Sequence, residues 1–297
     1  MTSRNSFLRE RKFSRELAAT DAPPLTLVEP LGRGVWRAEG EGGALLVKER
    51  PDPQAAAGEP WRAGLLHELR QRGHRIPDRL WYGPLPGGSF AVVDRWVDAD
   101  PLVRLDAATV EELLALVELQ ADVEHPLGHG FDVSEWISLV LFDGWEGWWD
   151  AAQSASRNAA ELCERLRRLV EPVRHRRLPV RDAVHHDLNV SNVLVADGAI
   201  AAVVDWDALG LGSRALDVAA LLAEWHRLRI ADPASAAEGG DVRLLERLER
   251  IDGDDGLRLA IGYRCVAVLG VSAGRDPPAA FARHERTVAA LLESIRV

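Results

Sequence analysis

The sequence has few of the residues that mark secreted, zinc-binding or membrane-spanning proteins. Among its 297 residues the only cysteines are Cys163 and Cys265, and neither stands in a CxxC or Cys/His spacing. A disulfide framework and a zinc site are therefore not expected, and two reduced thiols are predicted. No apolar run approaches the roughly 18 residues that cross a bilayer, and the charged opening segment, residues 1–20, lacks the apolar stretch of a secretory signal. These features predict a cytoplasmic protein without a membrane partner.

Lysine is also scarce. Lys12 and Lys48 are the only lysines among the 36 basic residues, and all the others are arginines. A lysine that persists in so arginine-rich a sequence indicates a position where a compact ammonium group serves better than a broad guanidinium. The formal net charge of −10 argues against a nucleic-acid partner, because such binding rests on neutralising phosphates. It favours a cationic partner, although solubility alone explains it equally well.

Two kinds of sequence pattern divide the chain. From residue 25 to residue 98, short segments rich in Val, Leu and Trp, such as GVWRAEG and GALLVKER, alternate with Gly, Pro and acidic turns and predict strands. One helical pattern interrupts them at residues 55–77 and stops at Gly73. After residue 101, long amphipathic segments predict helices. The sequence therefore predicts an α+β protein with an N-terminal arm or helix (1–24), a small β-rich N-lobe (25–98) and a larger helical C-lobe (99–297).

The segment VHHDLNVSNVLV, residues 184–195, places polar side chains between apolar ends. Together with AIAAVVDW, residues 199–206, it predicts a β-hairpin through the turn ADG. The two strand ends carry Asp187, Asn192 and Asp205. The last two supply oxygen ligands of the kind that Mg²⁺ accepts, and Asp187 is left to take a proton. This pattern predicts a phosphoryl-transfer site.

The acidic segment IDGDDGL, residues 251–257, matches a calcium-binding loop only in part. Gly256 arrives one residue early for the D-x-[DN]-x-[DN]-G pattern, and no glutamate stands at the twelfth position. The sequence therefore predicts a solvated turn here.

The predicted hairpin and the segment after it resemble the signature region of the aminoglycoside phosphotransferase and choline kinase group, small-molecule relatives of the protein kinases. That pattern is an H-x-D-x-x-x-x-N segment followed by a strand ending in I-D-W-[DE]. The matching positions are His185, Asp187, Asn192, Asp205, Trp206 and Asp207, with Asp217 opening the next helix. The resemblance implies a two-lobed protein-kinase-like fold, in which His185 and Asp217 support the catalytic loop. His186 stands where the group commonly has glycine.

The resemblance also implies that the protein binds ATP, or GTP, together with Mg²⁺, and that the N-lobe holds the nucleotide. Lys48 ends the strand GALLVK and would hold the phosphates, paired with Glu59 in preference to Glu68. Gly32 and Gly34 form an incomplete glycine-rich loop, because an arginine stands at the third glycine position. A plain turn explains these two glycines equally well.

The segment FAVVDRWVDADP resembles the hinge that joins the two lobes in that group. There the backbone near Asp94, Trp96 and Val97 would bind the adenine base. Trp96 is either a cover for the base or a core residue.

These features together predict an ATP-dependent phosphotransferase that acts on a hydroxyl group of a small molecule. The predicted acceptor is a cationic antibiotic, an aminoglycoside or a basic peptide, so that the enzyme confers antibiotic resistance. One alternative acceptor is a metabolite such as choline or an amino sugar, and a second alternative is a non-catalytic nucleotide-binding protein. A monomer or homodimer is expected. The predicted acceptor-binding residues are Asp207, Glu224, Trp225 and Trp148, although helix packing explains the two tryptophans equally well.

Overall fold

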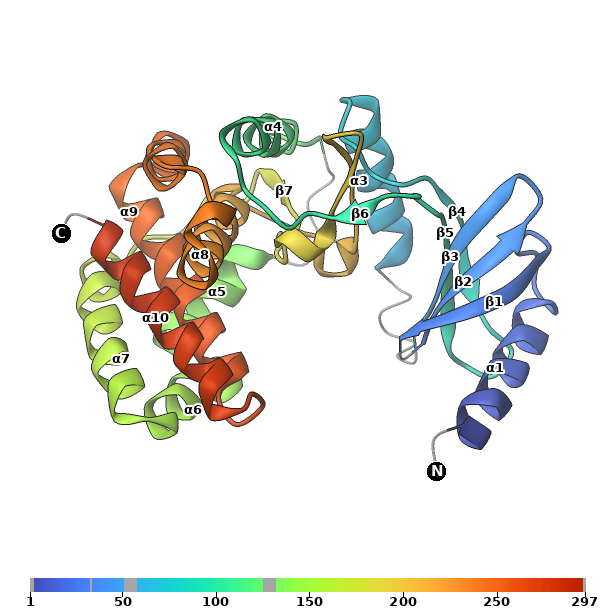
Figure 1. The fold of residues 1–297 in the computed structure, drawn as a ribbon, viewed down its shortest axis with the longest axis horizontal. Coiled ribbons are helices and arrows are strands. Elements are labelled where there is room, and N and C mark those ends of the chain that lie inside the picture. Colours follow the sequence, from blue (N-terminus) through green and yellow to red (C-terminus); the bar gives the residue numbers. More distant parts are fainter. Residues whose placement is uncertain (1–2, 33, 51–57, 125–131, 296–297) are drawn as a thin grey trace. The chain divides into compact units, whose positions relative to one another are not determined.

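The structure, a computed structural model, describes residues 3–32, 34–50, 58–124 and 132–295 (Figure 1). The chain divides into two compact units, which we name the N-terminal and the C-terminal unit. The first consists of Met1–Gln71 and Arg75–Ala99, and the second of Arg72–His74 and Asp100–Val297. None of the helices in the described ranges is long and apolar enough to cross a membrane.

The N-terminal unit is built on a five-stranded antiparallel sheet. Its strand order is β1 (Leu25–Gly32), β2 (Val35–Gly40), β3 (Gly43–Arg50), β5 (Phe90–Arg95) and β4 (Arg79–Pro84). Since β3 is the central strand, the hydrogen-bond register fixes Lys48 between Val35 of β2 and Val92 of β5. The short apolar segments of the sequence are therefore strands, as predicted.

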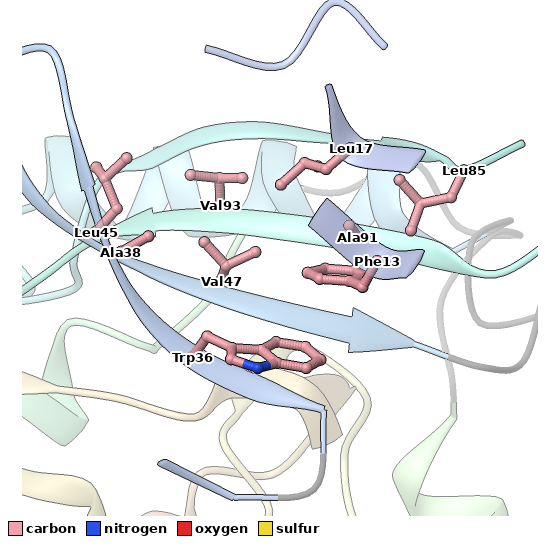
Figure 2. Close-up of a cluster of buried hydrophobic side chains, with 9 residues drawn as sticks. All are labelled: Phe13, Leu17, Trp36, Ala38, Leu45, Val47, Leu85, Ala91 and Val93. Carbon is pink, nitrogen blue, oxygen red and sulfur yellow. The ribbon is translucent and has the colours of Figure 1, made fainter. Parts of the chain in front are cut away.

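Helix α1 (Ser3–Leu17) packs on one face of this sheet (Figure 2). The Phe13 ring stacks on the Trp36 ring, with centroids 4.4 Å apart and an interplanar angle of 14°. Full burial of one such side chain stabilises a protein by about 1.5–3 kcal/mol. The opening segment is therefore a helix anchored in the core rather than a mobile arm. The buried cluster comprises Phe13, Leu17, Trp36, Ala38, Leu45, Val47, Leu85, Ala91 and Val93.

Helix α3 (Glu59–Gln71) follows the predicted helical pattern, with Leu65, Leu66 and Leu69 buried. The chain then passes through Gly73, whose φ of 95° lies in the left-handed region that glycine adopts without strain. The predicted stop of the helix at this glycine is confirmed.

The C-terminal unit is mainly helical and carries two small sheets. Its α-helices are α4 (Ala107–Glu118), α5 (Val133–Phe142), α6 (Trp148–Ala155), α7 (Arg157–Val170), α8 (Ala215–Ala231), α9 (Gly240–Ser272) and α10 (Pro278–Ser294). One sheet pairs β7 (Asp182–Val184) with β10 (Gly210–Gly212), and the other has the order β6 (Asp100–Pro101), β8 (Val193–Ala196), β9 (Ala199–Val203). The short 3₁₀ helices are η1 (Trp145–Gly147), η2 (Glu171–Val173), η3 (Val190–Asn192), η4 (Trp206–Ala208) and η5 (Pro233–Ser235).

The predicted hairpin is confirmed as β8 and β9, which are antiparallel. The polar part of VHHDLNVSNVLV is not a strand, however. It forms a loop and the 3₁₀ helix η3 between β7 and β8. Every residue of α8 from Ala215 to His226 is buried. A helix that is buried on all sides belongs to a core, and α8 packs against α4, α9 and α10.

The acidic segment 251–257 lies inside α9, so the prediction of a solvated turn is wrong. Gly253 interrupts the helix with φ 71° and ψ −172°, a conformation that is essentially limited to glycine. The side chain of Asp252 is only 4% exposed and accepts a hydrogen bond from the hydroxyl of Ser213. This contact with Ser213, two residues before α8, holds the Asp252 side chain inside the fold, while Asp254 in the same segment stays exposed.

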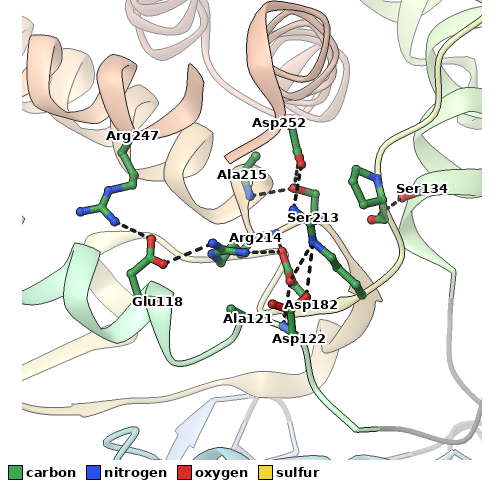
Figure 3. A network of polar contacts seen from close by, with 12 residues as sticks. Glu118, Ala121, Asp122, Ser134, Asp182, Ser213, Arg214, Ala215, Arg247 and Asp252 are labelled. Carbon is green, nitrogen blue, oxygen red and sulfur yellow. Dashed lines mark hydrogen bonds and ion pairs between the residues drawn. The ribbon is translucent and has the colours of Figure 1, made fainter. Parts of the chain in front are cut away.

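A buried charge network connects β7 to the start of α8 (Figure 3). Asp182 of β7 is completely buried and accepts hydrogen bonds from the amides of Asp122 (3.0 Å) and Arg214 (3.1 Å) and from Nη1 of Arg214 (2.9 Å). Arg214 also donates to Glu118 (3.2 Å), which accepts a second hydrogen bond from Arg247 (2.6 Å). Burial alone would lower the pKa of the Arg214 guanidinium, but Asp182 and Glu118 raise it. The network thereby fixes β7, which precedes the polar loop, to the start of α8.

Replacing Asp182 by alanine is expected to lower the free energy of unfolding of the C-terminal unit by about 3–5 kcal/mol, because it removes one partner of a buried ion pair. Chemical denaturation followed by circular dichroism measures this loss. Glu164→Ala, which breaks an exposed ion pair with Arg167, should cost less than about 1 kcal/mol. A loss at Asp182 no larger than that of this control would contradict the role of the network.

Candidate active site

The loop between β7 and β8 is held by one buried carboxylate. Asp217 lies in the first turn of α8, is completely buried, and accepts hydrogen bonds from the amides of His185 (2.8 Å) and His186 (2.9 Å). Burial raises the pKa of Asp217, while the neighbouring His185 and the two amides act against that rise. A carboxylate at a helix N-terminus is also favoured by the helix dipole. Asp217 therefore joins the loop backbone to the central helix.

His185 is completely buried beneath the loop. The amide of Asp187 donates to its Nδ1 at 3.2 Å, and its Nε2 lies 2.9 Å from the carbonyl oxygen of Val204, directly after β9. Since an amide can only donate, Nδ1 is the acceptor and Nε2 carries the proton. Both ring nitrogens are thus engaged with the backbone. His185 supports the loop and has no nitrogen left for proton transfer.

Asp187 is the exposed carboxylate of the loop, and two side-chain amides orient it. Nδ2 of Asn189 donates to Oδ1 of Asp187 at 3.1 Å, and Nδ2 of Asn192 lies 3.3 Å from Oδ2 and 2.8 Å from the carbonyl oxygen of Asp187. A carboxylate has further lone pairs, so it can still accept a hydroxyl proton. The sequence did not identify Asn189. Its Asx turn to the amide of Ser191 (3.0 Å) is the local pattern that could have indicated it.

One end of the β8–β9 hairpin brings the two predicted oxygen ligands to neighbouring backbone positions. Val193 pairs with Val203, and the amide of Val204 donates to the carbonyl of Asn192 at 2.8 Å. Asp205 is the next residue, exposed and with a left-handed φ of 63°. Asn192 and Asp205 therefore belong to the same hairpin end.

This pair of residues fits a hard cation. Because Nδ2 of Asn192 donates to Asp187, its Oδ1 is oriented as an acceptor, and no donor within the described ranges reaches it. Asp205 contributes a carboxylate. Amide and carboxylate oxygens are the ligands that Mg²⁺ takes in proteins.

His186 has a left-handed backbone, with φ 69°, which glycine adopts at lower cost. Its ring stacks on Tyr263, with centroids 5.4 Å apart and an interplanar angle of 14°, and its Nε2 lies 2.7 Å from the Tyr263 hydroxyl. The indole N–H of Trp136 donates to the same hydroxyl at 3.1 Å, which leaves the hydroxyl proton available for the hydrogen bond with His186. Burial, and then the charge of Arg264, lower the pKa of His186 to about 4. The ring is therefore neutral.

A cavity of about 440 Å³ adjoins this loop within the C-terminal unit. Asp187 and His186 form part of its wall, together with residues of α6, α8, α9 and α10. The volume lies in the range of small-molecule sites. Of the predicted acceptor-binding residues, Trp148 and Glu224 line this cavity. A hydroxyl compound bound there would lie beside the Asp187 carboxylate.

The structure contradicts the prediction that Trp225 binds the acceptor. Its side chain is buried, and its indole N–H donates to the carbonyl of Ala237 at 3.1 Å. It packs closely on Gly240, where an added Cβ would lie 2.5 Å from Nε1. Trp225 is therefore a core residue, as helix packing alone would require.

Asp207 lies half-buried in η4 and is not among the cavity residues, so the cavity does not support its predicted role.

In the N-terminal unit, Lys48 is buried on β3 and Glu59 is buried at the start of α3. The carboxylate of Glu59 forms ion pairs with Arg62 (2.6 Å) and with Arg79, which in turn pairs with Asp94 (2.9 Å). The sequence did not identify Arg79, because its two partners lie far from it along the chain. The pairing of Lys48 with either of the predicted glutamates stays a prediction.

The predicted glycine loop lies between β1 and β2. Gly32 ends β1 and is exposed, and Gly34 has φ 79° and accepts an amide hydrogen bond from β3 at 2.7 Å. In the predicted hinge, the amide of Trp96 donates to a carbonyl of β3 at 3.1 Å, and the Arg37 guanidinium lies 5.5 Å from the centre of the Trp96 ring. The carbonyl of Val97 accepts a hydrogen bond at 3.1 Å. Nucleotide binding by these residues stays a prediction.

The β-rich unit, the helical unit and the H-x-D-x-x-x-x-N loop together define an α+β, protein-kinase-like fold. Residues 31–258 match the model of the phosphotransferase enzyme family, which covers well over half of the chain. The protein belongs to this family. No match was found among curated proteins.

Solved structures of several kinases are similar over nearly the whole chain. A thermostable mutant of the aminoglycoside phosphotransferase APH(4)-Ia, in ternary complex with ADP and hygromycin B, has a TM-score of 0.63 and 17% identity and covers 96% of this chain and 98% of its own. Choline kinase LicA from Streptococcus pneumoniae has a TM-score of 0.62 and 13% identity, with coverage of 97% and 100%. A microcompartment-associated aminopropanol kinase has a TM-score of 0.62 and 15% identity, with 95% of each chain covered. At such identities the similarity shows a shared fold, and substrates do not follow from it.

The lowered pKa of His186 predicts an acid-dependent loss of stability. The unfolded chain binds the proton near the ordinary value of 6.5 and the folded chain only near 4, so the free energy of unfolding should fall as the pH drops from 6.5 towards 4. His186→Asn tolerates the left-handed backbone and cannot titrate, so it is expected to show a shallower fall. Denaturation at several pH values measures the difference. His175→Asn, at an exposed position, should retain the wild-type slope, and an equal slope for His186→Asn would contradict the assignment.

Proposed function

We propose that the protein transfers the γ-phosphoryl group of ATP to a hydroxyl group of a small molecule. The observation that carries this proposal is the carboxylate of Asp187, which Asn189 and Asn192 orient and which lines a cavity of about 440 Å³. Membership of the phosphotransferase enzyme family supports the reaction type. The complex of APH(4)-Ia with ADP and hygromycin B supports a nucleotide and a small molecule as the two substrates.

In this proposal the acceptor binds in the cavity with its hydroxyl proton directed at Asp187. The hydroxyl oxygen forms a bond to the γ-phosphorus while the bond from that phosphorus to the bridging oxygen of the β-phosphate breaks. The hydroxyl proton passes to the Asp187 carboxylate, and ADP leaves. Because such transition states are loose, positioning and charge neutralisation supply most of the rate. His185 and Asp217 contribute only through the backbone of the loop.

The sequence assigns residues in each unit, taken separately, to the nucleotide phosphates. Asn192 and Asp205 are the residues assigned to Mg²⁺, which when bound neutralises the charge of the phosphates. Lys48 is assigned to the α- and β-phosphates, where a compact ammonium suits better than a guanidinium. Gly32, Gly34 and the backbone at 94–97 are assigned to the nucleotide. GTP is the alternative donor.

The sequence favours a cationic antibiotic as the acceptor, with antibiotic resistance as the outcome. The net charge of −10 and the similarity to an aminoglycoside kinase support this choice. The alternative is a metabolite such as choline or an amino sugar, supported by the similarity to choline kinase and aminopropanol kinase. The wall of the cavity argues against both, because Glu224 is paired with Arg227 and no carboxylate in the described ranges forms an ion pair with Arg264.

The second alternative is a nucleotide-binding protein without catalysis. Such proteins usually lack the lysine, the proton acceptor or the metal-binding aspartate. This chain has Lys48, Asp187 and Asp205, which favours an active enzyme. We also propose a cytoplasmic location and a monomeric or homodimeric state. Both of these proposals rest on the sequence alone.

Asp187→Asn is expected to lower kcat by about 100-fold to 10,000-fold, the usual contribution of a positioned proton acceptor. Binding of ATP should remain close to that of the wild type, because the substitution keeps the shape of the side chain. ADP release with a panel of hydroxyl compounds measures the rate, and titration calorimetry measures nucleotide binding. Asp254→Asn, at an exposed position of α9, is the matched control. Loss of nucleotide binding in Asp187→Asn would mean that its role has been misassigned.

Asp205→Ala is expected to abolish turnover, since it removes a carboxylate assigned to Mg²⁺. The variant should also lose the Mg²⁺ dependence of nucleotide affinity, which calorimetry with and without Mg²⁺ detects. Phosphotransfer that persists in this variant would count against both the metal assignment and an active enzyme of this type.

A further inference from the structure

The charged side chains around the acceptor cavity differ from those that a cationic acceptor requires. Its wall includes the carboxylates of Asp187 and Glu224 and the guanidinium groups of Arg227 and Arg264. We infer that the acceptor is a hydroxyl compound that carries an anionic group, and that Arg264 of α9 binds this group. The inference rests on the proposed phosphotransfer, because it concerns the second substrate of the same site.

Glu224 and Arg227 neutralise each other. Nε of Arg227 lies 3.0 Å from both carboxylate oxygens of Glu224, and Nη2 lies 2.7 Å from Oε2. The hydrogen bonds that Arg227 donates to Glu224, together with the negative charge of that carboxylate, raise the pKa of Arg227. Glu224 is only 8% exposed, and charge-assisted, bidentate contacts of this kind are strong. A cationic acceptor would have to break this pair in order to use Glu224.

The remaining polar side chains of the wall offer no free carboxylate with which the ammonium group of an acceptor could pair. His186 is neutral, because its pKa is lowered to about 4, and Tyr263 is neutral, because burial raises its pKa to about 12. His284 lies 3.1 Å from a carboxylate oxygen of Asp276. Asp187 is the one other carboxylate among the cavity residues that the structure describes, and it is assigned to the hydroxyl proton.

Arg264 is the cation of this wall that lacks a counter-ion. It is half-buried on α9, and no carboxylate in the described part of the chain forms an ion pair with it. Its Nε is buried without a hydrogen-bond acceptor. A partly desolvated guanidinium without a partner is costly, and a carboxylate or phosphate can bind its planar donors in a bidentate manner. An anionic group on the acceptor supplies the missing partner.

The rest of the wall indicates what kind of molecule carries the anionic group. Trp148, Val268 and Val271 line the cavity along with Tyr263. The Trp148 and Tyr263 rings lie with centroids 6.3 Å apart, so the two form one aromatic surface. Apolar walls favour a carbon skeleton and disfavour a strongly hydrated polycation. The acceptor therefore combines a hydroxyl near Asp187, an apolar or aromatic body and an anionic group at Arg264.

The test uses sets of three hydroxyl compounds with the same carbon skeleton: a hydroxy acid, its amide and the corresponding amino alcohol. A parallel series with a phosphate monoester in place of the carboxylate separates the two sources of negative charge. Steady-state ADP release by the full chain gives kcat/KM for each compound. The wild type is expected to prefer the anionic members over the amino alcohols by about 10-fold to 100-fold, the range of a charged hydrogen-bonded contact.

Substitutions at Arg264 assign this preference to one side chain. Arg264→Ala and Arg264→Gln are expected to lower kcat/KM for the anionic compound, relative to its amide, by about 10-fold to 100-fold. Arg264→Glu should shift the preference towards the amino alcohol. Arg250→Ala, at an exposed position of the same helix and outside the cavity, should keep the wild-type preference. Circular dichroism and thermal unfolding show whether each variant is folded, and Arg264→Gln retains most of the side-chain volume.

Three results would overturn the inference and leave the proposed phosphotransfer in place. The first is a wild-type preference for the amino alcohols, and the second is a preference for anions that Arg264→Ala and Arg264→Gln retain. The third concerns binding and applies if no compound in the sets is phosphorylated. Equilibrium binding of the same compounds is then measured, and the inference is overturned if the anionic compounds bind no more tightly than the amino alcohols. A failure of the proposed function looks different, because the wild type would then bind no nucleotide and phosphorylate no hydroxyl compound of any charge.

Discussion

The hydrogen bonds from two consecutive amides to the buried carboxylate of Asp217 are the interaction on which the active-site loop depends. A carboxylate removed from water without donors costs several kcal/mol, so the loop and helix α8 stabilise each other. The buried ion pair between Asp182 and Arg214 fixes the start of the same helix to β7. The carboxylate of Asp187 is exposed and is oriented by Asn189 and Asn192, while the buried groups and the His185 ring hold the backbone of the loop that carries it.

His186 shows how one substitution changes both the loop and the cavity. A left-handed backbone at a residue other than glycine costs about 1–3 kcal/mol. One hydrogen bond and one stacked ring contact with Tyr263 are together worth about 1–3 kcal/mol, so they offset the strain. His186 therefore holds its left-handed backbone through its contacts with Tyr263. It adds a neutral aromatic ring to the cavity wall, where glycine would leave open space.

The net charge of the whole chain and the charges of the cavity wall favour different kinds of acceptor. The net charge of −10 favours a cationic partner, but exposed charges act through about 8 Å of salt solution before they are screened. A bound acceptor contacts the cavity wall, where Glu224 is already paired with Arg227 and Arg264 has no counter-ion. Contact charges outweigh distant ones in a partly buried site. The acidic surface is thus explained by solubility, and in the proposed function the charges of the cavity wall select the acceptor.

Local pattern in the sequence was sufficient for the strands, for helix α3 and for the H-x-D-x-x-x-x-N loop, because each depends on residues close together in the chain. It also singled out Asp187, Asn192 and Asp205 as candidates, since the loop before β8 and the end of β9 carry the spacing between them. Tertiary structure alone decided that the Asp252 side chain is buried, that Trp225 belongs to the core, and that Trp148 and Arg264 line the cavity. The contact of His186 with Tyr263 joins residues 77 positions apart. Such contacts form only when the helices pack, and no local pattern records which segments will meet.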